Sequence, residues 1–124
     1  MKAAVTPARI RVLVVSPFPD DHVQLGKILR REQWELRHAM TCEQAQAILE
    51  STVCRIVISE AKIAGHCWKK MLSAIRRLPE REQPKLVVAS PQADDSLWSE
   101  VLNLGGHNVL AKPFDRTEVE WVLQ

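Results

Sequence analysis

Four short segments place polar side chains directly after runs of apolar residues. They are Ser16-Pro17, Glu60, Ala89-Ser90 and Lys112-Pro113. Together they supply a carboxylate, an ammonium group and two hydroxyls, which are groups that form ion pairs and bind ions. If the apolar runs are parallel strands, all four segments lie at the carboxyl edge of one sheet, where such folds bind ligands. The sequence therefore predicts one candidate site shared by these segments.

Metal, nucleotide and nucleophilic chemistry are less well supported. The three cysteines, at positions 42, 54 and 67, cannot all pair within the chain and form no C-x-x-C motif, so we expect reduced thiols. A zinc site from Cys54, His66 and Cys67 would lack the fourth ligand that structural zinc uses. The turn from Ser16 to Pro19 has no glycines that could present free amides to a phosphate. We expect no metal, no cofactor and no enzymatic activity.

Length and composition indicate one ordinary globular domain. The chain has 124 residues, 46% of them hydrophobic and 26% charged, with a formal net charge of +2. We expect an N-terminal tail over 1–9 and one domain over 10–124. No apolar run approaches the ~20 residues of a membrane span, and no secretory signal opens the chain. A cytoplasmic protein without membrane contact is predicted, and the absence of a basic stripe argues against nucleic-acid binding.

Five apolar runs alternate with five helical patterns. The runs predict strands over 11–15, 34–39, 55–59, 85–89 and 108–111. The helical patterns begin near Asp20, at the capping box that starts at Thr41, near Trp68, before Leu97, and at Asp115. The first helix is expected to run to about Glu32. Strand and helix in alternation, with short connections, predict a doubly wound α/β domain around a five-stranded parallel sheet with five helices.

One segment carries a specific resemblance to a known family. The run Gly105-Gly106-His107-Asn108-Val109-Leu110-Ala111-Lys112-Pro113-Phe114 resembles the G-A-x-D-Y-L-x-K-P-F segment of response-regulator receiver domains. Residues 34–39, followed by a capped helix, are similar to the second strand and helix of that family, and the likeness spans about residues 10–124. The resemblance implies a flavodoxin-like sheet with strand order 2-1-3-4-5 and a cis peptide bond between Lys112 and Pro113.

The same resemblance fails at the positions that carry receiver chemistry. Receivers accept a phosphoryl group on an aspartate after strand three and hold Mg²⁺ with acids after strand one. Here Ser16 and Pro17 fall on the metal-binding acids and Glu60 falls on the phosphoacceptor. Ala89 falls on the switch hydroxyl, with Ser90 one residue later, and Val109 replaces the switch aromatic. Lys112 alone is retained.

Several alternatives stay open at these positions. The Glu60 carboxylate either reaches Lys112 in a partly buried ion pair or caps the strand end in water. A slip of one residue would bring Ser90 into the hydroxyl position. A slip of four residues would bring Asp20 and Asp21 to the metal site, but it would require a bulge through the prolines at 17 and 19.

These substitutions predict a degenerate pseudo-receiver. We expect a signalling interaction module of a phosphorelay that works without phosphorylation. The alternative is a divergent receiver that is still phosphorylated at a rearranged acidic site using Asp20, Asp21 or Glu60. The short final helix hints at a longer protein with an output domain after residue 124.

A partner surface is predicted on the fourth helix, fifth strand and fifth helix, which is the usual docking face of receivers. Leu97, Val101 and Leu104 form the stripe that should pack on the sheet. The residues expected to lie outside that stripe, and to bind a protein partner or a second copy of the chain, are Trp98, Leu102, Val109 and Val122. In the alternative reading, Trp98 folds over the edge of the core.

Overall fold

The structure is a computed structural model that describes residues 9–63 and 65–124. The main sheet consists of β1 (Ile10–Val15), β2 (Trp34–Ala39), β3 (Ile56–Glu60), β6 (Lys85–Ser90) and β7 (Asn108–Ala111). The helices are α1 (Pro19–Ile28), α2 (Cys42–Ser51), α3 (Trp68–Arg76), α4 (Asp95–Asn103) and α5 (Arg116–Leu123), with a short 3₁₀ turn, η1 (Glu80–Glu82). All but one residue of the predicted tail over 1–9 fall outside the described part. No helix within that part is long and apolar enough to cross a membrane.

The five strands pair in parallel in the order β2-β1-β3-β6-β7. Counted along the sheet, this is the predicted order 2-1-3-4-5, so the predicted fold is confirmed. A small antiparallel hairpin of β4 (Lys62–Ile63) and β5 (His66–Cys67) was not predicted. Its strands have two residues each, which is too short for an alternating pattern to show in the sequence. Gly65, between them, has a φ of +85°, which suits glycine.

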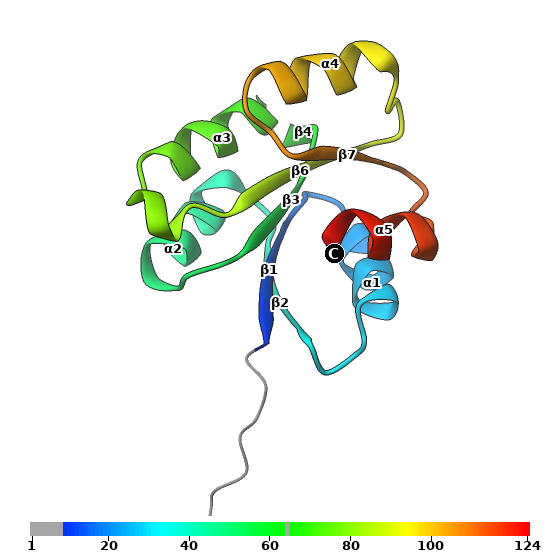
Figure 1. The fold of residues 1–124 in the computed structure, drawn as a ribbon, viewed down its shortest axis with the longest axis horizontal. Coiled ribbons are helices and arrows are strands. Elements are labelled where there is room, and N and C mark those ends of the chain that lie inside the picture. The colour runs from blue at the N-terminus through cyan, green and yellow to red at the C-terminus, as the bar shows by residue number, and fades with distance from the viewer. Residues whose placement is uncertain (1–8, 64) are drawn as a thin grey trace, which may run out of the picture.

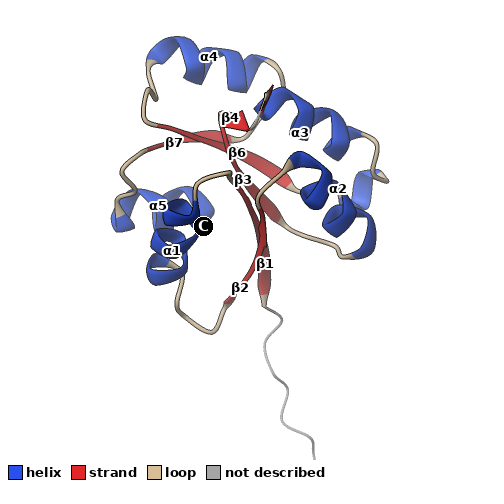
Figure 2. Cartoon of the chain, turned by 180° about the vertical axis from the view of Figure 1, so that it is seen from behind, coloured by secondary structure: helices blue, strands red, loops and turns tan. Residues whose placement is uncertain are grey.

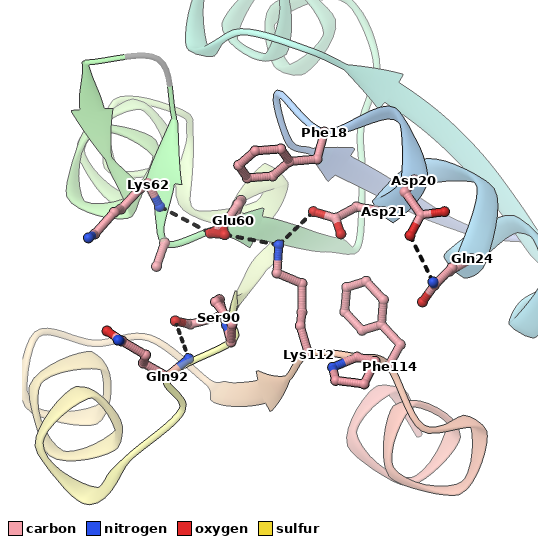
Figure 3. Close-up of a pocket in the computed structure, with 13 residues that line it drawn as sticks. Phe18, Asp20, Asp21, Gln24, Glu60, Lys62, Ser90, Gln92, Lys112 and Phe114 are labelled. Atoms are coloured by element: carbon pink, nitrogen blue, oxygen red, sulfur yellow. Dashed lines mark hydrogen bonds and ion pairs between the residues drawn. The ribbon is translucent and has the colours of Figure 1, made fainter.

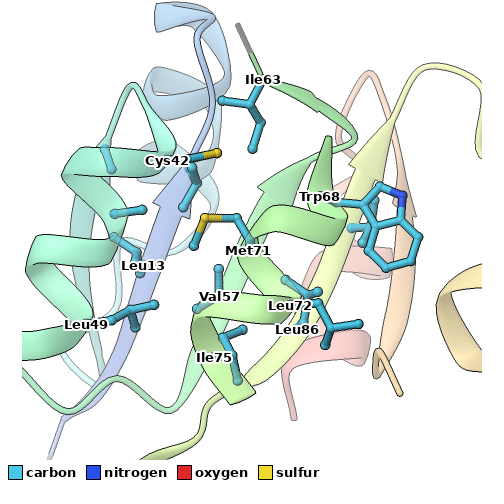
Figure 4. Close-up of a cluster of buried hydrophobic side chains, with 14 of the residues drawn as sticks. Leu13, Cys42, Leu49, Val57, Ile63, Trp68, Met71, Leu72, Ile75 and Leu86 are labelled. Carbon is cyan, nitrogen blue, oxygen red and sulfur yellow. The ribbon is translucent and has the colours of Figure 1, made fainter. Parts of the chain in front are cut away.

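Helices cover both faces of the sheet, α1 and α5 on one and α2, α3 and α4 on the other (Figures 1 and 2). The side chains of β1 alternate between the two cores. Val12 and Val14 pack with Leu25 of α1 and Val119 of α5. On the opposite face, Leu13 and Val15 join a core that includes Val57, Leu49, Met71 and Ile75 (Figure 4). Because both faces are buried, the strands read as continuous apolar runs.

Local signals explain where most helices begin. The Thr41 hydroxyl accepts the backbone N–H of Gln44 at 3.1 Å, and the Asp115 carboxylate accepts that of Glu118 at 3.0 Å. Helix α1 ends at Ile28, before the predicted end near Glu32. The chain must turn there, because Trp34 already pairs with Ile10 at the start of β2.

Candidate functional site

The four predicted segments meet at the carboxyl edge of the sheet. The pairings of Glu60 with Ala89 and of Ser90 with Ala111 bring the ends of β3, β6 and β7 into register. Lys112 follows β7 directly, and its peptide bond to Pro113 is cis. The parallel sheet thus gathers side chains that are far apart in the sequence.

Lys112 lies at the centre of an ion-pair cluster (Figure 3). Its Nζ is 2.8 Å from Asp21 Oδ2 and 2.9 Å from Glu60 Oε1, and the three side chains are only 12%, 12% and 5% exposed. Burial by itself lowers the pKa of Lys112, but the hydrogen bonds to Asp21 and Glu60 outweigh it and place that pKa above its ordinary value. The expected contact between Glu60 and Lys112 is therefore present, and Lys112 is held in its charged form.

The second carboxylate of the cluster corrects the sequence interpretation. The sequence interpretation kept Asp21 only as an alternative, because a slip in register that brings it to the site would need a bulge. No slip is needed, since α1 begins at Pro19 and its first turn carries the Asp21 side chain back to the end of the sheet. The feature of the sequence that points to Asp21 is the pair of acids, Asp20 and Asp21, in the first turn of the helix that follows the end of β1.

Ser16 supports Asp21. Its hydroxyl donates to Asp21 Oδ2 at 2.6 Å and accepts the backbone N–H of Phe18 at 3.0 Å. Both oxygens of the Glu60 carboxylate also have partners. Its Oε1 binds Lys112, and its Oε2 accepts the backbone N–H of Lys62 at 3.1 Å. Each carboxylate therefore has a second hydrogen-bond donor besides the ammonium group.

A cavity of about 630 Å³ opens onto this cluster. Phe18 and Phe114 form apolar walls, and Lys112 Nζ lies 4.8 Å from the centre of the Phe18 ring. The remaining lining residues are Asp20, Asp21, Gln24, Glu60, Ala61, Lys62, Ser90, Pro91, Gln92, Lys112 and Pro113. The sequence interpretation missed the two phenylalanines as site residues and named Asp20 and Asp21 only for the alternative acidic site.

Not every predicted pocket residue lines this cavity. Ser16 lies behind Asp21, and neither Pro17 nor Ala89 is among the lining residues. Ala89 packs instead into the core beneath α1 and α5. Ser90 does line the cavity, so the hydroxyl at this edge comes from Ser90, and it accepts the backbone N–H of Gln92 at 3.0 Å.

Comparisons with known proteins point to one fold. No family model matches the chain. Over 107 residues it is 27% identical to the "Probable chemotaxis protein CheY" of Rhizobium etli, covering 86% of this chain and 83% of that protein. The structure of the signal receiver domain of an HD domain-containing protein from Pseudomonas fluorescens Pf-5 matches 93% of this chain and 91% of its own, with a TM-score of 0.79 and 23% identity.

A second solved structure agrees more closely in shape. The chemotaxis response regulator CheY4 of Vibrio cholerae covers 94% of this chain and 98% of its own, with a TM-score of 0.83 and 17% identity. The chain has the CheY-like receiver fold. The sequence likeness to the Rhizobium etli protein extends over most of the chain and agrees with this fold.

The receiver fold implies a Mg²⁺ ion, and we tested whether the residues at this edge fit one. Magnesium takes oxygen ligands, normally including free carboxylates. Here the Asp21 and Glu60 carboxylates both bind Lys112, and Asp20 accepts a hydrogen bond from Gln24 at 2.9 Å. Among the described side chains, no three of His, Cys, Asp or Glu are grouped so as to hold a metal ion. The residues present do not fit the magnesium site of a working receiver.

The predicted partner face of the receiver-like domain is only partly exposed. Trp98 is 49% and Leu102 37% exposed, and the Trp98 indole donates to Asn108 Oδ1 at 3.3 Å. Val109 and Val122 are buried, which corrects their assignment to a surface. Val109 belongs to the core beneath α2, α3 and α4, and Val122 to the core beneath α1 and α5.

Leu104 also departs from its prediction. It was expected to pack on the sheet with Leu97 and Val101, yet it is exposed. Leu104 is the C-cap of α4, after the last helical residue Asn103, and it packs against neither of the two buried cores.

Proposed function

We propose that this chain is a cytoplasmic signalling interaction domain of a two-component phosphorelay, and that it works without being phosphorylated. The observation that carries the proposal is the closed ion-pair cluster. Lys112 binds both buried carboxylates at once, at 2.8 and 2.9 Å. Each carboxylate also accepts a second hydrogen bond from within the chain, so the oxygens that could bind a metal ion already have partners.

The chemistry of phosphoryl transfer supports this reading. Catalysis of that transfer rests on positioning and on neutralising charge, for which receivers use Mg²⁺. Ser16 and Pro17 stand where the metal-binding acids would be, and Glu60 stands where the phosphoacceptor would be. Glu60 places a negative charge beside Lys112 and roughly imitates the charge of a phosphorylated aspartate, so one conformation is favoured without a phosphoryl group.

Intact-mass spectrometry after incubation with Mg²⁺ and acetyl phosphate tests the proposal. We expect no added phosphate on the chain, and no change in Trp fluorescence with Mg²⁺ and beryllofluoride. A receiver domain with all three acids serves as the reagent control. A variant that combines Ser16→Asp, Pro17→Asp and Glu60→Asp tests whether these positions account for the loss. A phosphate adduct on the unaltered chain would refute the proposal.

One observation favours a second candidate, a divergent receiver with a rearranged acidic site. Asp20 lines the cavity together with Asp21 and Glu60, and Asp20 itself is exposed. If a phosphate adduct forms, fragmentation of the modified peptide would locate it. Loss of the adduct in Asp20→Asn, with retention in an Asp115→Asn control, would assign the acceptor.

We further propose that a protein partner, or a second copy of the chain, binds on the face around α4. Trp98 and Leu102 are one helical turn apart and both exposed, so together they offer an apolar contact surface. We expect Trp98→Ala to shift the sedimentation coefficient of the chain toward that of a monomer, or to abolish binding of a partner. Val53→Ala, which trims an exposed apolar side chain after α2, is the control. Unchanged sedimentation and partner binding in Trp98→Ala would exclude this face.

A further inference from the structure

Two histidines meet outside the cavity, on the side of the sheet covered by α1. His22 Nδ1 of α1 lies 2.8 Å from His38 Nδ1 of β2, and the centres of the two rings are 4.9 Å apart. His38 is exposed and His22 is partly exposed, so water reaches the pair. Neither residue lines the cavity at the end of the sheet.

The hydrogen bond on the other side of the His22 ring fixes its tautomer. His22 Nε2 lies 2.9 Å from the backbone oxygen of Ser16. A carbonyl oxygen only accepts, so the proton of the neutral ring sits on Nε2, and Nδ1 carries the lone pair that faces His38. Histidines that bind metals are oriented in this way, with the second ring nitrogen donating to a carbonyl or a carboxylate.

We propose that His22 and His38 form a two-imidazole site for Zn²⁺, with water molecules completing the coordination. Zinc accepts imidazole nitrogen at about 2.0–2.1 Å, so two such ligands in a tetrahedral site lie roughly 3.3 Å apart. The observed separation of 2.8 Å between the Nδ1 atoms is close to that value. Zinc binding would widen this separation by about 0.5 Å, and we expect the exposed His38 ring to rotate to allow it.

The proton of His38 must move for this residue to act as a ligand. Because His22 Nδ1 accepts in the observed contact, His38 Nδ1 is the donor, and zinc binding requires the His38 proton to sit on Nε2 of that exposed ring instead. The pair is also connected to the ion-pair cluster, because Ser16 accepts from His22 through its backbone oxygen and donates to Asp21 through its hydroxyl. The proposed site does not depend on whether the chain is phosphorylated.

Titration calorimetry with ZnCl₂ on the reduced, chelator-treated chain tests the site. We expect one equivalent of zinc to bind, and binding to weaken at least tenfold in His38→Ala and in His22→Ala. His107→Ala removes an exposed histidine elsewhere and should bind zinc as the unaltered chain does. Cys67→Ser, which removes a thiol that could bind zinc on its own, should also leave this equivalent unchanged.

Nitrogen-detected NMR of the imidazole rings gives a second measurement. Zinc should shift the Nδ1 resonances of His22 and His38 while the Nε2 of His22 stays protonated. Circular dichroism without zinc verifies that each variant is folded, and His38→Ala carries the test because its side chain is exposed. Equal zinc binding by the unaltered chain and His38→Ala, or no saturable binding by the folded unaltered chain, would overturn the proposal.

Discussion

Replacing Lys112 by methionine tests the ion-pair cluster most directly. The substitution keeps an apolar stem of similar length but removes the ammonium group, which leaves Asp21 and Glu60 buried without their cation. Their side chains are 12% and 5% exposed. Breaking a buried ion pair on one side costs about 3–5 kcal/mol, so we expect the free energy of unfolding at pH 7 to fall by roughly that amount. Urea denaturation followed by Trp fluorescence measures the loss.

A surface ion pair provides the matched control. Lys69 Nζ lies 3.2 Å from Glu100 Oε2, and its side chain is 50% exposed. An exposed pair contributes at most about 1 kcal/mol, so Lys69→Met should have a small effect. The difference between the two variants in lost free energy of unfolding gives the contribution of burial to the Lys112 ion pairs.

A compensating variant sharpens the test. Adding Asp21→Asn and Glu60→Gln to Lys112→Met should recover much of the lost stability, because no uncompensated charge remains buried. A deficit no larger than that of Lys69→Met, with no recovery in the triple variant, would refute the view that the cluster is buried and closed.

Two further predictions follow from the same structure. Because the pKa of Lys112 is raised in the folded chain, its stabilisation is complete below its ordinary value of 10.5 and is lost as the pH rises through the folded-state pKa. Between these values the unaltered chain should lose stability faster than Lys112→Met, by up to about 1.4 kcal/mol per pH unit, in urea titrations at each pH. A Cβ added at Gly26, within α1, meets no atom within 4 Å, so Gly26→Ala should raise the free energy of unfolding by about 0.5–1 kcal/mol. At Gly106 the added Cβ would lie 2.4 Å from Val101 Cγ1, so Gly106→Ala should lower it by about 1–3 kcal/mol, and equal midpoints for the two variants in thermal denaturation would contradict this contrast.

Local patterns in the sequence predict the five strands of the main sheet, the five helices and the edge at which the site lies. Continuous apolar runs are what a strand buried on both faces requires, and the Thr41 and Asp115 caps act within one helical turn. Glu60 and Lys112 directly follow or end such strands, so the parallel topology alone brings them to one edge. All of these signals are local in the chain or follow from a single rule of topology.

Which further side chains meet at that edge and beside it depends on how the helices pack on the sheet. The pairing of Asp21 with Lys112 depends on how the first turn of α1 is set against the sheet, and successive residues of a helix point about 100° apart. The same dependence buries Val122 while it exposes Trp121, its neighbour on α5. His22 and His38 meet because α1 packs over the edge strand β2, and no spacing in the sequence encodes that distance.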